Sequence, residues 1–91
     1  MIKKAVLIQL GKMVELKRKI HDEWVSQNYP EELQMKWKLV HKVFKCLEEH
    51  ARGKIKSNIP YPLLADFLLE NAEKLNYKEL HQEVMKIVFL N

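Results

Sequence analysis

Few side chains in this 91-residue sequence could carry out covalent or acid–base chemistry. There is no threonine, and the only two serines, Ser26 and Ser57, fall at predicted helix boundaries, where capping is their usual role. The adjacent acids Glu31-Glu32 and Glu48-Glu49 point in different directions on a helix, whereas paired acid–base catalysis needs convergent carboxylates. The two glycines stand 42 residues apart and form no phosphate-binding loop. The sequence therefore predicts that the protein is not an enzyme.

Two histidines and the cysteine within residues 41–50 are the nearest to a set of metal ligands in the sequence. Cys46 and His50 are four residues apart and could share one side of a helix, and His41 precedes the cysteine by five residues. Two ligands on one helix make half a site, because a structural zinc site needs four. We expect Cys46 to pack as a small apolar residue, and we expect no metal and no cofactor.

Basic residues outnumber acidic ones by 16 to 12, and the excess lies in the first part of the chain. Residues 1–56 hold 13 basic and 7 acidic side chains, whereas residues 57–91 hold 3 and 5. Seven basic residues fall within 36–56, namely Lys36 and a candidate basic patch of Lys38, Lys42, Lys45, Arg52, Lys54 and Lys56. Such a patch could bind a row of phosphates. However, the sequence has 14 lysines and only 2 arginines, and arginine is the side chain whose forked guanidinium is best suited to recognising phosphates and bases. The alternative function is therefore that of a basic nucleic-acid-binding or regulatory protein of bacterial or phage origin. A solvated helix face is the simpler interpretation of the lysines.

The composition predicts one helical domain over residues 1–91. Apolar residues make up 47% and charged residues 31%, with only two glycines and three prolines. Such a chain is too apolar to be disordered and too poor in turn residues for a β-sandwich.

The spacing of apolar residues predicts two long helices first. The first covers about 2–27 and has one stripe of apolar residues. Lys17 occupies one position of that stripe, where its methylenes could lie on the apolar surface while its ammonium reaches water. That stripe is Ile2, Val6, Leu10, Met13, Ile20 and Trp24. The second helix ends near Ala51 and has two stripes, so it must touch more than one neighbour. These are Leu33, Trp37, Val40, Phe44, Leu47 and Ala51, and beside them Met35, Leu39, Val43 and Cys46.

Two shorter helices follow, at about 61–74 and 77–90. Asn28 with Glu31, and Asn76 with Glu79, predict capping boxes before the second and fourth helices. Gly53 can adopt the left-handed conformation that ends a helix. Two long and two shorter helices with short connections predict an antiparallel four-helix bundle. The alternative is that the short apolar runs 5–8 and 87–90 pair as strands.

Some apolar residues fall off the inward stripes of these helices. They are Leu7, Val14 and Val25 in the first helix, and Met85, Phe89 and Leu90 in the fourth. Apolar surface left over on a small bundle is typical of a docking site or a homodimer seam. We therefore expect the protein to act by binding a protein partner, with Met85, Phe89 and Leu90 at the contact, or to pair with a second copy.

The sequence also bears on location. No segment approaches the roughly 20 apolar residues that span a bilayer, and a single cysteine excludes an internal disulfide bond. A soluble protein of the reducing cytoplasm is the simplest expectation. The amphipathic first helix could instead lie on a membrane surface, although a bundle needs the same pattern.

The second part of the chain presents a particular order of motifs. The stretch 40–50 (VHKVFKCLEEH) is followed by a lysine-rich linker, then by 59–64 (IPYPLL), then by a short pair of helices closing on Glu79-Leu80. In this order residues 33–90 resemble the enterocin A-type bacteriocin immunity proteins. The resemblance implies a small, basic, cytoplasmic four-helix bundle of lactic-acid bacteria, which protects its producer by acting with a membrane sugar-transporter receptor and without chemistry. The first helix is longer here than in that family, and the sequence stops where the family often carries a C-terminal tail.

Overall fold

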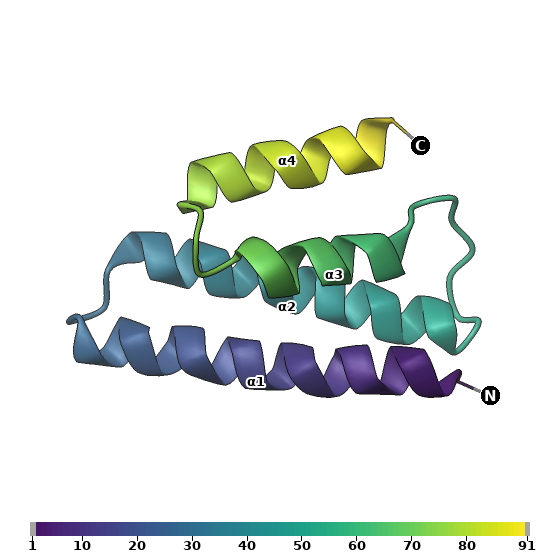
Figure 1. The fold of residues 1–91 in the computed structure, drawn as a ribbon, viewed down its shortest axis with the longest axis horizontal. Helices are drawn as coiled ribbons and strands as arrows, with labels where there is room; N and C mark the ends of the chain where they lie inside the picture. The colour runs from purple at the N-terminus through teal and green to yellow at the C-terminus, as the bar shows by residue number, and fades with distance from the viewer. Residues whose placement is uncertain (1, 91) are drawn as a thin grey trace.

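The computed structural model describes residues 2–90, and their regular secondary structure is entirely helical (Figure 1). The helices are α1 (Lys4–Ser26), α2 (Glu31–Ala51), α3 (Tyr61–Asn71) and α4 (Tyr77–Phe89). The expected all-α class with four helices is confirmed for these residues. They contain no strand, so the strand pairing considered for 5–8 and 87–90 is wrong, because both runs continue the helical period of α1 and α4.

The second helix is the centre of the arrangement. α2 packs against each of the other three helices, as its two apolar stripes predicted. α4 packs on α2 and α3 and does not reach α1 (Figure 1). α1 and α4 are therefore neighbours of α2 that do not touch each other.

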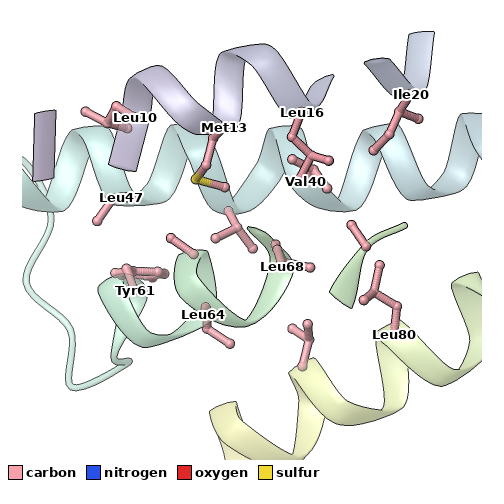
Figure 2. Packing of buried hydrophobic residues seen from close by; sticks show 14 of the residues in the cluster. Leu10, Met13, Leu16, Ile20, Val40, Leu47, Tyr61, Leu64, Leu68 and Leu80 are labelled. Carbon is pink, nitrogen blue, oxygen red and sulfur yellow. The ribbon is translucent and has the colours of Figure 1, made fainter. Parts of the chain in front are cut away.

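One cluster of buried side chains joins all four helices (Figure 2). Each helix contributes a residue with no exposed surface, and these are Met13, Val40, Leu68 and Leu80. Leu16 rather than Lys17 completes the buried stripe of α1, and Lys17 is only half-buried. On α2, Trp37 and Phe44 are also only half-buried, because Val43 and Lys36 take inward positions.

The turn between α1 and α2 corrects one expected cap. Asn28 does not cap α2, which begins after Pro30 without a side-chain cap. Asn28 instead takes the left-handed conformation (φ 65°) that ends α1, and the Tyr29 amide donates to the Trp24 carbonyl at 2.7 Å. The Tyr29 ring then meets the Trp24 ring edge-on at 4.8 Å, which is the apolar contact that often accompanies this type of helix end.

The structure confirms Gly53 as a helix end and shows the Asn76 half of the second capping box. Gly53 has φ 75°, its amide donates to the His50 carbonyl and the Lys54 amide donates to the Glu49 carbonyl, so α2 ends in a Schellman motif. Asn76 accepts a 2.9 Å hydrogen bond from the Glu79 amide at the start of α4. α3 ends at Asn71, three residues earlier than expected, in a turn that leads directly to this cap.

None of the helices in the described part of the chain combines the length and the apolar character needed to cross a membrane.

Candidate functional site

A groove runs between α2 and α4, with a volume of about 510 Å³. Its lining residues recur at helical spacing on both sides, so each helix gives one face to it. They are Glu31, Gln34, Met35, Lys38, Leu39 and Lys42 from α2, and Tyr77, His81 and Met85 from α4. The groove floor is therefore built from part of the second apolar stripe of α2, which the core does not fully cover.

A second hollow adjoins the groove and follows α4 alone to its C-terminal end. This hollow, of about 700 Å³, shares His81 and Met85 with the groove and extends to Phe89 and Leu90. Phe89 is 81% exposed and Leu90 is 84% exposed, as expected for residues off the inward stripe. Met85 differs from them, because it packs partly against the core and leaves only part of its side chain to the groove.

The rim of the groove is positively charged. Lys38 and Lys42 are exposed, and neither forms an ion pair with any residue in 2–90. Lys86 lies further along α4 and pairs with Glu83 at 3.1 Å. Glu31 is the acidic residue of the lining, at the end where α2 begins. Apolar contact with flanking positive charge is the chemistry that this groove offers a ligand.

The other residues of the candidate basic patch lie elsewhere. Lys45 and Arg52 flank Glu48, with nitrogen–oxygen distances of 3.5 and 3.8 Å. Lys54 and Lys56 lie in the connection between α2 and α3. Lys38 and Lys42 are thus the members of the patch that the structure places beside the apolar groove.

Lys36 belongs to the interior and not to the basic surface on which the sequence placed it. It is 7% exposed, and its Nζ donates to the carbonyl oxygen of Ala72 at 2.9 Å. Ala72 is the C-cap of α3, where the unpaired carbonyls carry partial negative charge. The lysine therefore completes the end of another helix, a role that depends on how α2 and α3 pack.

The sequence did not reveal a second cluster, on the α1 side of α2. The Lys17 Nζ lies 4.2 Å from the Phe44 ring centroid and 3.1 Å from His41 Nδ1. The His41 ring stacks on Trp37 with centroids 4.8 Å apart. A charged ammonium can only donate, so Nδ1 accepts and the neutral ring carries its proton on Nε2. The spacing of Trp37, His41 and Phe44 along one face of α2 was the available signal, but nothing in it indicated Lys17.

Burial and neighbouring charge set the protonation of this cluster. Burial, then Lys17, then Lys45 lower the pKa of His41 below its ordinary value. Burial and Lys45 also lower the pKa of Lys17, while Glu48 raises it. The arrangement therefore favours neutral His41 beside the lysine. Because Lys17 covers the rings, its ammonium does not simply reach water as the sequence suggested.

The candidate metal ligands are separated by packing. Cys46 is a half-buried free thiol against the core, and His50 lies against the Tyr61 ring at 5.4 Å between centroids. Within residues 2–90 no three His, Cys, Asp or Glu side chains gather closely enough to hold a metal ion.

Comparison of the chain with protein-family models, with curated proteins and with solved structures finds no match.

Proposed function

We propose that the protein is a non-catalytic antiparallel bundle of two long and two shorter helices that acts by binding a protein partner. The observation that carries the proposal is the exposure of Phe89 and Leu90 on α4 and its C-cap, in a hollow that shares His81 and Met85 with the groove between α2 and α4. Aromatic and aliphatic side chains that converge on a groove with a charged rim are typical of the centre of protein–protein contacts. Met85 extends the same surface toward the core.

The test is site-specific photo-crosslinking in the native host, with benzoyl-phenylalanine placed at position 89. We expect one protein to be captured there, because the exposed Phe89 belongs to the proposed contact. The matched control places the same group at Leu63, which is 54% exposed on α3. Identical capture from both positions, or none from position 89, would contradict binding at the end of α4.

The resemblance of residues 33–90 to enterocin A-type immunity proteins supports a more specific version of this function. In that version the protein works in the cytoplasm of a bacterium and its partner is the membrane receptor of a bacteriocin. Expression of the chain in an enterocin A-sensitive strain should then raise survival, and Phe89→Glu should abolish the gain. Unchanged sensitivity with normal expression would remove this version and leave the general one.

Nucleic-acid binding is the second candidate, favoured by the unpaired, exposed Lys38 and Lys42 one turn apart on α2. It predicts affinity for duplex DNA that falls steeply as salt rises, because counterions are released from phosphates. Absence of retention on DNA at low salt excludes it.

A further inference from the structure

The shape of the groove indicates what kind of segment it can hold. The groove is lined by α2 from Glu31 to Lys42 and by α4 from Tyr77 to Met85, and beyond Met85 the hollow is lined by α4 alone. At 1.5 Å per residue the α2 edge of the groove is about 17 Å long. Two helices side by side leave a straight channel between their ridges, and a third helix fits such a channel better than an irregular loop does.

The side chains of the groove indicate the chemistry of that helix. Its floor contains Met35, Leu39 and Met85, and the adjoining hollow along α4 contains Phe89 and Leu90. Methionine side chains are flexible and polarisable, which suits an apolar surface that receives a partner helix. The ammonium groups of Lys38 and Lys42 stand beside this floor without an acidic partner among the described residues.

We propose that the α2–α4 groove binds an amphipathic helix of the partner protein whose apolar face is flanked by acidic residues. The inference rests on the proposed protein-binding function and names the chemistry of the partner at the same site. The apolar face lies on Met35, Leu39 and Met85 and reaches Phe89. The acidic flank meets Lys38 and Lys42, so charge complementarity sets the specificity.

Two other occupants fit the same residues less well. In a symmetric dimer the same patch meets itself, and its lining offers only Glu31 as an acidic partner for the two rim lysines, so positive charge would be left unpaired. Duplex DNA would pair the lysines with phosphates, but its backbone offers nothing to cover the exposed Phe89 and Leu90. An acidic amphipathic helix would cover the apolar floor with its apolar face and pair with the rim lysines through its acidic residues.

The test uses two synthetic 18-residue helical peptides with the same leucine face, one flanked by glutamates and the other by lysines. Each is titrated into the isotope-labelled full chain and followed by NMR. We expect the glutamate-flanked peptide to bind about tenfold more tightly, and to shift the resonances of Met35, Leu39 and Met85. Equal affinities, or shifts confined to other surfaces, would overturn the proposal.

Charge reversal then assigns the preference to the two lysines. The double variant Lys38→Glu/Lys42→Glu should lose the preference for the glutamate-flanked peptide or invert it. The matched control Lys54→Glu/Lys56→Glu makes the same change of net charge in the α2–α3 connection and should keep the preference. Thermal unfolding followed by circular dichroism shows whether each variant is folded. A preference that survives in the first variant, or is lost equally in both, overturns the assignment.

Further outcomes separate this proposal from the proposed function. If the resonances of the same residues shift with protein concentration in the absence of peptide, the occupant of the groove is a second copy of the chain and not an acidic helix. Shifts of the lysines with DNA and none with either peptide would favour the nucleic acid. Capture of a protein from position 89, together with no peptide preference, would refute the acidic helix and leave protein binding intact.

Discussion

The two flanks of α2 carry similar residues and meet different surroundings. On the α1 side, Trp37 and Phe44 lie beneath Lys17, whose ammonium also bonds to His41. On the α4 side, Met35 and Leu39 line a groove whose rim lysines have no acidic partner in residues 2–90.

The difference arises from the neighbours that each flank has. α1 runs beside α2 and supplies a long side chain to cover the aromatic rings, whereas α4 leaves a hollow of about 510 Å³ between itself and α2. On the α1 flank the lysine beside the apolar surface, Lys17, is in contact with that surface inside the fold. On the α4 flank the lysines beside the apolar surface are free to contact a ligand. Residue type alone does not distinguish a packed surface from a binding surface.

The largest expected effect compares two leucines of α2. Leu47→Ala should lower the free energy of unfolding by about 2–5 kcal/mol, because the side chain is 1% exposed and its removal leaves a cavity. Leu39→Ala on the groove flank should lower it by about 1 kcal/mol, because the side chain is only partly buried. Urea unfolding followed by circular dichroism measures both. Equal losses would show that the groove flank is as tightly packed as the core.

A second comparison uses two lysines of the same helix. Lys36→Ala should lower the free energy of unfolding by about 2 kcal/mol, since it removes a buried stem and leaves the Ala72 carbonyl without its donor. Lys38→Ala, on the exposed rim, should change it by less than about 0.5 kcal/mol. The same urea experiment decides. A large loss at Lys38 would mean that the rim is already engaged within the fold.

The third comparison uses the two glycines, at both of which there is open space for a methyl group. A Cβ at Gly11 in α1 would meet no atom within 4 Å, so Gly11→Ala should raise the free energy of unfolding by about 1 kcal/mol. Gly53 has equally open surroundings but a φ of 75°, so Gly53→Ala should lower it by about 1 kcal/mol. Thermal and urea unfolding of the pair test this. Stabilisation at both positions would contradict the role of the backbone at Gly53.

The smallest expected effect is a pH dependence of the covered flank. Burial and the charges of Lys17 and Lys45 lower the pKa of His41 in the folded state, so the unfolded chain binds a proton more readily. The contribution of this group is therefore present above its unfolded pKa of about 6.5 and is lost as the pH falls through that value toward the folded pKa.

The measurement is the free energy of unfolding between pH 7.5 and pH 5, with and without the substitution His41→Asn. The substitution should flatten the decline over this range, and Lys17→Met should reduce it, because one of the charges that lower the pKa is removed. An unchanged decline in both variants would place its origin elsewhere.

Local rules account for much of the fold. The apolar period gives the four helices, and the chemistry of Gly53 and Asn76 gives two of their ends, because each depends on residues within a few positions along the chain. Asn28 shows where such rules compete. Asparagine is favoured both as an N-cap and as the left-handed residue that ends a helix. The conformation of the α1–α2 turn shows that Asn28 ends α1.

The candidate site was predictable only in parts. The excess of apolar residues in the fourth helix pointed to Phe89 and Leu90, which are exposed. The six candidate basic residues could not be sorted from the sequence, because their partners lie on other turns and other helices. Lys45 and Arg52 form ion pairs with Glu48, whereas Lys38 and Lys42 line the groove.

The sequence by itself determined the helical class and the apolar faces of the helices, because backbone geometry turns residue spacing into faces. The tertiary structure alone decided which of those faces is covered. The rotation of each helix about its axis brought Lys36 to the end of α3 and Lys17 over Phe44, and it left Met35 and Leu39 facing the groove beside α4. Such rotations follow from the packing of side chains across helices, which the spacing within a single helix does not contain.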